Sequence, residues 1–162
     1  MRHSPEKIQE WLRRIKGHEG GYWDDPVGGP TKWGISQRSY PGLSIKDLTI
    51  EDAAGIYRRD YIQPLGVDMF EDGVAYQLLD FAVNSGQPNA VKALQKELNV
   101  YPDGRIGKNT MQAVMSYKES DLAQLVIASR ISFMIKLKNW DENSRGWMDR
   151  MAKNIRYSVQ DT

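Results

Sequence analysis

One stretch near the start of this 162-residue sequence constrains its fold more than any other. Residues 18–36 read HEGGYWDDPVGGPTKWGIS, with paired glycines, two prolines and two tryptophans. Glycine and proline at this density break helices and allow tight turns, so the stretch predicts a short hairpin or irregular β element. The sequence on both sides of it has a helical pattern, and we therefore expect a single small β insertion after the first helix.

The first helix is defined by signals at both of its ends. Ser4 followed by Pro5 is typical of a capped helix start. Apolar residues then recur with helical spacing, which gives the helix one buried face. Gly17 is the expected end, so Glu19 lies just beyond the helix.

The rest of the chain predicts further helices. Thr49 and Asp52 have the spacing of a capping box, and the helix that they start must stop before Pro64. The later helical segments are expected at residues 72–86, 89–100, 110–117, 121–140 and 144–159. We expect residues 121–140 to form the central buried helix, because this segment is long and apolar. The fold class is therefore mainly α, or α+β.

Composition excludes several classes of function. The chain has 22 basic and 21 acidic side chains and a net charge of +1, which argues against a nucleic-acid interface. It has no cysteine, so disulfides, thiolate metal sites and cysteine nucleophiles are excluded. Two histidines are too few for a metal site. We expect no metal or other cofactor, no signal peptide and no membrane insertion, since the chain lacks a run of about 18 apolar residues.

The glycine-rich stretch carries a candidate acid. Aromatic neighbours of Glu19 lower the local polarity, and desolvation raises the pKa of a carboxyl group. Asp24 and Asp25 follow within a few residues, and the Thr31 hydroxyl can hold a water. Paired carboxyl groups across a cleft are what glycoside hydrolysis requires. The alternative is structural: Glu19 caps the turn, and the aspartates form Asx-turns.

Four motifs occur in an order that resembles glycoside hydrolase family 108, the phage endolysins and N-acetylmuramidases. They are EGGYWDDPVGGPTKWGIS, IYRRDYI, DFAVNSGQPNAVKALQKELNV and DGRIGKNTMQAV. The similarity runs from about residue 7 to residue 155. It implies a lysozyme-like, two-lobed fold in one catalytic domain, with a glycosidase lobe at 1–92 and a helical peptidoglycan-binding-like lobe at 93–162. It places the cleft between the lobes.

The resemblance also implies roles for individual residues. Glu19 matches the catalytic glutamate of the family's EGGY motif, and Thr31 matches the threonine after the paired glycines. The family pattern carries a second aspartate before those glycines, but DDPVGGP is two residues shorter here. The second catalytic group is therefore Asp25, with Asp24 as the alternative, or a water held by Thr31. Tyr22 and Trp33 are the expected aromatic surfaces for a sugar ring.

Four polar residues of the middle segment are further candidates for sugar contacts. Tyr61 and Gln77 are expected to touch the substrate directly. Asp80 and Asn84 lie four residues apart and so share one helix face. They either line the cleft opposite Glu19 or satisfy neighbouring backbone groups.

The remaining motifs have structural explanations. DGRIGKNT predicts a tight turn and a helix start, because Asp103 lacks the other acidic ligands of a calcium loop. Arg130 and Arg150, with Trp140 and Trp147, are expected to form salt bridges and to pack in the core. We expect no separate site among them.

The resemblance implies a monomeric peptidoglycan hydrolase that cleaves the β-1,4 bond between N-acetylmuramic acid and N-acetylglucosamine. An endolysin of this kind collects in the host cytoplasm until a holin opens the membrane, and then acts on the wall. Two alternatives remain. A lytic transglycosylase cuts the same bond with one glutamate and forms an anhydro sugar. A wall-binding or secretion-associated module does no chemistry.

Overall fold

The computed structural model describes residues 2–17, 21–26 and 29–162, except for the side chain of residue 25. The chain divides into two compact units, Met1–Asp60 and Tyr61–Thr162. The boundary between residues 92 and 93 was expected from the resemblance of the motifs to a known family. It does not coincide with the boundary between the two compact units. The expected architecture of helices with one small β element after the first helix is confirmed.

In the first unit, helix α1 (Pro5–Lys16) forms where the sequence predicts it. The Ser4 hydroxyl accepts a hydrogen bond from the Lys7 backbone N–H at 3.2 Å, which caps the helix. The helix ends at Gly17, where φ is 70°. Its apolar face packs against helix α2 (Ile50–Tyr57) of the same unit. The buried residues of that face are Ile8, Trp11, Leu12 and Ile15.

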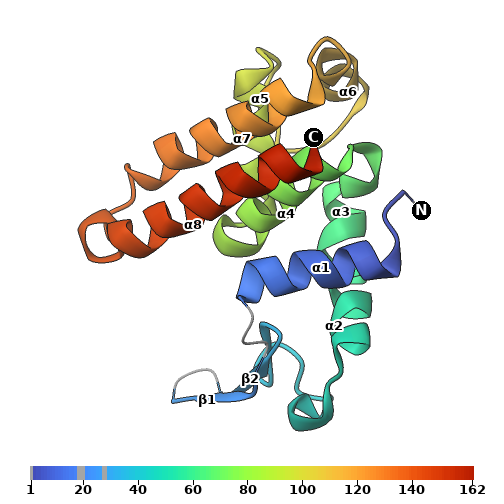
Figure 1. Ribbon diagram of the computed structural model, residues 1–162, viewed down its shortest axis with the longest axis vertical. Helices are drawn as coiled ribbons and strands as arrows, with labels where there is room; N and C mark the ends of the chain where they lie inside the picture. Colours follow the sequence, from blue (N-terminus) through green and yellow to red (C-terminus); the bar gives the residue numbers. More distant parts are fainter. Residues whose placement is uncertain (1, 18–20, 27–28) are drawn as a thin grey trace. The chain divides into compact units, whose positions relative to one another are not determined.

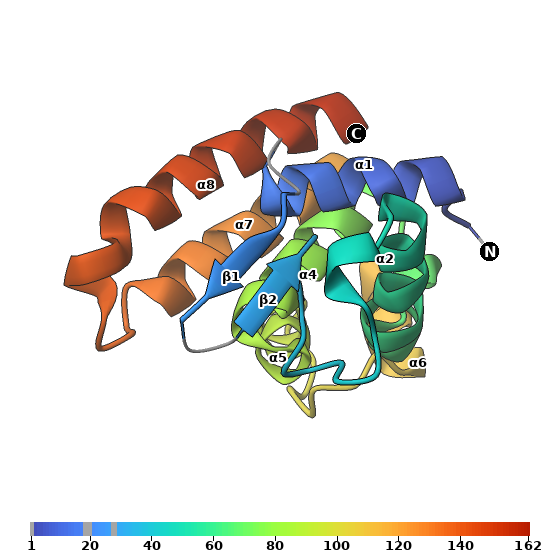
Figure 2. The same ribbon diagram turned by 90° about the horizontal axis from the view of Figure 1, so that it is seen from below.

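A three-stranded antiparallel sheet follows α1 in the chain. Its strands are β1 (Trp23–Asp25), β2 (Gly29–Lys32) and β3 (Ile35–Ser36), in the order β1-β2-β3. Figure 2 shows β1 and β2 side by side as two short arrows. The predicted hairpin is therefore confirmed.

The segment after the sheet contains a short 3-10 helix, Ile45–Asp47, and then α2. The predicted capping box is present, because Thr49 Oγ1 accepts from the Asp52 N–H at 3.1 Å and Asp52 accepts from the Thr49 N–H at 3.0 Å. The α-helix ends before Pro64, as expected. Helical backbone nevertheless continues through a π turn (Arg58–Ile62) into α3 (Gln63–Leu65). Pro64 fits there because the first turn of a helix needs no N–H donor.

The second unit is built around helix α4 (Asp72–Ser85), in which every residue from Gly73 to Ala82 is buried. Three helices pack on α4: α5 (Gln87–Glu97), α7 (Glu119–Met134) and α8 (Trp140–Asp161). Figure 1 shows α7 and α8 running side by side. The shorter elements of this unit are α3, η3 (Val67–Met69) and α6 (Lys108–Val114).

The expectation that residues 121–140 form the central buried helix is wrong. α7 ends at Met134, and α8 already begins at Trp140. α7 keeps an exposed face along its length, whereas residues 73–82 of α4 are covered on all sides, because α5, α7 and α8 all pack on α4. In the described part of the chain, α4 included, the search for a helix of membrane-spanning length and hydropathy finds none.

Candidate active site

The exposed aromatic side chains of the first unit lie at the start of the sheet. Tyr22 is 47% exposed and Trp23 is 64% exposed, although large apolar rings are normally covered. Trp23 lies in β1 opposite Thr31 of β2. A ring presented to solvent in this way is available to stack on a sugar. Tyr22 was expected in this role. Trp23, the next residue, is more exposed than Tyr22 and can serve the same role.

Thr31 is held in the middle of the sheet. It pairs with Trp23 on one side and with Ser36 of β3 on the other. Its hydroxyl donates to the Gly29 carbonyl at 3.2 Å, and its side chain is half-buried. A threonine hydroxyl has one proton and two lone pairs, so this donation leaves acceptor capacity for a water.

Trp33 and Gly34 make the turn between β2 and β3. Their φ angles are 53° and 75°, as in the type I′ turns that join two-residue hairpins. Glycine adopts this conformation easily, but a bulky residue at positive φ is an outlier. The half-buried Trp33 is thus held at a positive φ by the turn, at a cost in backbone strain of about 1–3 kcal/mol.

Gly34 allows this turn to approach the end of α1. A Cβ atom at position 34 would lie 2.1 Å from Lys16 Cε and 2.8 Å from the Tyr57 hydroxyl. Neither distance is compatible with a side chain there. The close approach joins the turn after β2 to the last residue of α1 and to the last residue of α2, so the strand that carries Thr31 has a fixed position within its unit.

The three acidic candidates differ in how far the structure describes them. Glu19 lies in the segment 18–20, outside the described residues. Asp25 is described only by its backbone, which pairs with Gly29. Asp24 is exposed and pairs with Pro30. The assignment of the catalytic carboxylates therefore stays a prediction.

The second unit contains a fully buried carboxylate, Asp80 on α4. It forms ion pairs with Arg130 of α7 and Arg150 of α8. Arg150 Nε donates to Asp80 Oδ2 at 3.1 Å, and Asn154 Nδ2 donates to the same oxygen at 2.7 Å. Burial alone would raise the pKa of Asp80, but the two arginines hold it at about 2. The expectation of salt bridges at Arg130 and Arg150 is confirmed.

The other polar residues of α4 also form hydrogen bonds within the unit. Gln77 is 2% exposed and donates to the Asn154 carbonyl at 3.0 Å. Asn84 is exposed at the end of α4, and its amide donates to the Asp80 carbonyl at 2.7 Å. For Asn84 the structure shows the second of the two expected alternatives, a bond to neighbouring backbone. The predicted sugar contacts of Gln77 and Asp80 find no support in these buried positions.

Tyr61 is the last of the predicted sugar contacts. Tyr61 is half-buried in the π turn and takes part in an interaction, so the structure neither assigns nor removes its expected sugar contact.

The rings of Trp140 and Trp147 are 6.0 Å apart and pack beside a buried cluster that contains Ile127, Met134 and Met151. Over the described ranges, no group of three His, Asp or Glu side chains is arranged to hold a metal ion.

Comparison with known families divides the chain into two segments. Residues 12–86 match the model described as glycosyl hydrolase 108. Residues 89–152 match the model described as a predicted peptidoglycan domain. The first segment contains Glu19, Asp25 and Thr31, together with all the strands of the sheet. A search among curated proteins finds no significant match.

Comparison with solved structures gives a match over the full length. The chain is similar to the structure of SagA from Brucella abortus, with a TM-score of 0.81 and 29% sequence identity. The match covers 98% of this chain and 97% of that one. The mainly helical, lysozyme-like fold expected from the sequence is therefore confirmed.

Proposed function

We propose that this chain, a glycoside hydrolase acting on peptidoglycan with a glycosyl hydrolase 108 domain at residues 12–86, hydrolyses the β-1,4 bond between N-acetylmuramic acid and N-acetylglucosamine. The family match over residues 12–86 carries this proposal, since that segment contains the acidic, glycine-rich motif. The predicted peptidoglycan domain behind it supports the same substrate.

Glu19 is the proposed general acid. It comes three residues after the end of α1 and three residues before the exposed Tyr22. A carboxyl group covered by aromatic rings and substrate has a raised pKa and keeps its proton near neutral pH. It then protonates the glycosidic oxygen as the bond to the sugar carbon breaks.

The second group acts on the opposite face of the sugar. Successive strand residues alternate between the two faces of a sheet, so Asp24 belongs to the face opposite that of Trp23 and its partner Thr31. We therefore propose Asp25 rather than Asp24 as the second carboxylate, and a water held by the Thr31 hydroxyl is the other route to the attacking group.

Mass spectrometry of the released muropeptides tests the reaction. Hydrolysis of purified peptidoglycan gives products with reducing N-acetylmuramic acid ends. Anhydro-muramic ends would show a lytic transglycosylase instead, and unchanged sacculi would show a module without catalysis. The paired variants Asp25→Asn and Asp24→Asn then test the second group, since only the first is expected to lower the rate of product release.

We further propose that the enzyme acts as an endolysin whose release depends on a holin. The support is the resemblance of its motifs to phage endolysins. Expression in a Gram-negative host with and without a co-expressed holin tests this role through culture turbidity. Lysis only with the holin is expected, whereas rapid lysis without it would contradict the proposal.

A further inference from the structure

The second unit contains a cavity that the proposed chemistry does not use. Its volume is about 300 Å³, at the lower end of the range for ligand pockets, which suits one or two residues of a peptide. One side comes from the segment 63–69, and the other comes from α5 and the loop 104–106. These two sides belong to different family segments, the glycosidase and the peptidoglycan domain, but to one compact unit.

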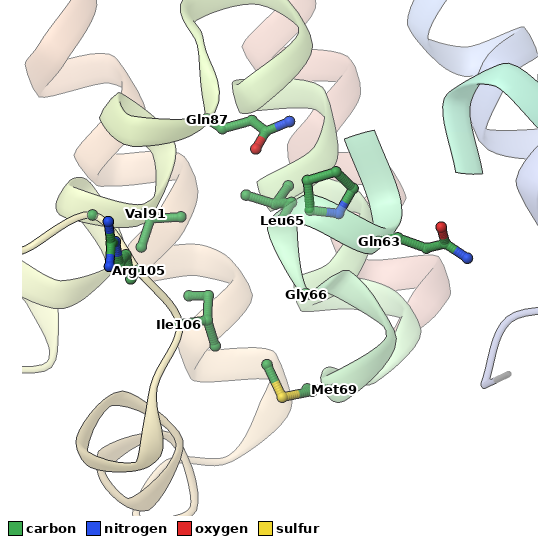
Figure 3. A pocket seen from close by; sticks show the side chains of 10 residues that line it. Gln63, Leu65, Gly66, Met69, Gln87, Val91, Arg105 and Ile106 are labelled. Atoms are coloured by element: carbon green, nitrogen blue, oxygen red, sulfur yellow. The ribbon is translucent and has the colours of Figure 1, made fainter. Parts of the chain in front are cut away.

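Apolar side chains form part of the cavity lining, beside polar groups. In Figure 3, Val91 and Ile106 face Leu65 and Met69 across the opening. Leu65 and Val91 are each 2% exposed, whereas Met69 is 43% exposed at the rim. Gly66 keeps the space open, because a Cβ atom there would lie 2.8 Å from Met69 Cε and 3.7 Å from Ile106 Cβ. The space matches a small apolar group such as a methyl.

Polar groups lie at the edge of the same cavity. Arg105 lies beside Val91, and Gln87 lies at one end in Figure 3. Lys92 adds a second cation, since its Cε would be 3.3 Å from a Cβ atom at Gly104. Asp103, near Arg105, is the acid of this loop. Its pKa is lowered first by the hydrogen bond from Gln95 and also by the charge of Arg105. The two cations exceed the one carboxylate, so the edge favours an anionic ligand.

The loop that carries Arg105 and Ile106 is held by a buried glutamine. Gln95 is 1% exposed, and its Nε2 donates to Asp103 Oδ1 at 2.7 Å and to the Arg105 carbonyl at 3.0 Å. Its Oε1 accepts from the Gly104 N–H at 2.8 Å. Because this amide fixes the loop from inside the unit, the cavity wall is preformed, which reduces the entropic cost of binding.

We infer that this cavity binds the peptide stem of peptidoglycan, with an alanyl methyl group against Ile106 and Met69 and a stem carboxylate on Arg105. The inference rests on the proposed function for its substrate. Stems combine small methyl side chains with free carboxylates on a short peptide, which are the two features that the walls and the edge accept. This contact adds to the binding of the glycan strand. It lowers KM for peptidoglycan that carries stems and leaves KM for bare glycan strands unchanged.

Hydrolysis of two substrates by variants of the full chain tests the inference. The substrates are intact peptidoglycan and the same glycan after an amidase has removed its stems. We expect Arg105→Ala to raise KM on intact peptidoglycan by about fivefold, as for one charge-assisted hydrogen bond, with kcat unchanged. Arg105→Lys restores part of the loss, and Arg105→Glu increases it. Arg156→Ala on α8, another exposed arginine of the unit, is the matched control.

Equal effects of Arg105→Ala on both substrates, or no effect on either, would overturn the inference. Direct binding separates this failure from failure of the proposed function. The free stem tripeptide is titrated into the Glu19→Gln variant and followed by NMR at the amides of Gly66, Gly104 and Ile106. Shifts there that Arg105→Glu removes support the stem site even in a protein without hydrolase activity, and their absence contradicts it.

Discussion

The sheet of the first unit and the Asp80 cluster of the second unit use polar residues in opposite ways. The sheet presents Tyr22 and Trp23 to solvent, and the close approach of Gly34 fixes its turn. Asp80 has no exposed surface, and side chains from α7 and α8 surround its oxygens. A carboxylate with its partners built into the fold has a lowered pKa and no proton to give at neutral pH. We therefore expect acid catalysis to belong to the first unit and Asp80 to contribute to stability.

The largest expected effect on stability comes from Asp80→Asn. This change leaves the charge of the buried Arg130 without its partner, and we expect a loss of about 3–5 kcal/mol in the free energy of unfolding. Urea denaturation measures it. Asp149→Asn is the control, because Asp149 pairs with Lys153 on the exposed face of α8 and contributes less than about 1 kcal/mol. If Asp80→Asn left stability unchanged but abolished hydrolysis, Asp80 would act at the substrate. The contrast between the sheet and the Asp80 cluster would then be wrong.

The same carboxylate predicts a dependence of stability on pH. Its pKa is about 2 in the folded chain, below the ordinary value of 3.8, so the unfolded chain takes up the proton first as the pH falls. The contribution of Asp80 is complete above about pH 4 and is lost toward pH 2. We expect the difference in melting temperature between wild type and Asp80→Asn to shrink over this window. A constant difference would show that the charge of Asp80 is not what stabilises the fold.

A smaller effect is expected at Gly34 in the first unit. Alanine there combines a positive φ with contacts to Lys16 and Tyr57 that are too short, and we expect a loss of about 1–3 kcal/mol. Thermal denaturation compares it with Gly42→Ala, where a Cβ atom meets nothing within 4 Å. Equal melting temperatures for the two variants would mean that the turn is not fixed by this approach.

Trp23→Ala gives the smallest expected change, and it affects binding. The ring is exposed, so stability changes by less than about 0.5 kcal/mol. Loss of one stacking surface raises KM on peptidoglycan by about fivefold, equivalent to about 1 kcal/mol. Tyr101→Ala removes a ring that is 85% exposed in the second unit and serves as the control. A KM that stays at the wild-type value would show that Trp23 does not contact the sugar.

Local signals in the sequence predicted the starts of α1 and α2 and the hairpin. Ser4 and Thr49 cap their helices through hydrogen bonds to residues three positions away. Both partners of each bond therefore lie within a short stretch of sequence. The glycines and prolines of 20–35 likewise act within a few residues. Such features depend on nearby chain alone, and the structure reproduces them.

The role of Asp80 could not be read in the same way. Its partners lie 50, 70 and 74 residues further along the chain, on α7 and α8. A polar pair at positions 80 and 84 fits a cleft or a buried network equally well, and only the packing of three helices decides between them. The central position of α4 was missed for the same reason, because burial on all sides depends on the number of neighbouring helices.

Lysis by the Glu19→Gln variant tests the central claim most directly. The change keeps the size of the side chain and removes the proton donor, so we expect turbidity loss of outer-membrane-stripped cells to slow by about 10²- to 10⁴-fold. An unchanged melting temperature shows that the variant is folded. Lysis at the wild-type rate by this folded variant would contradict the assignment of Glu19 as the general acid.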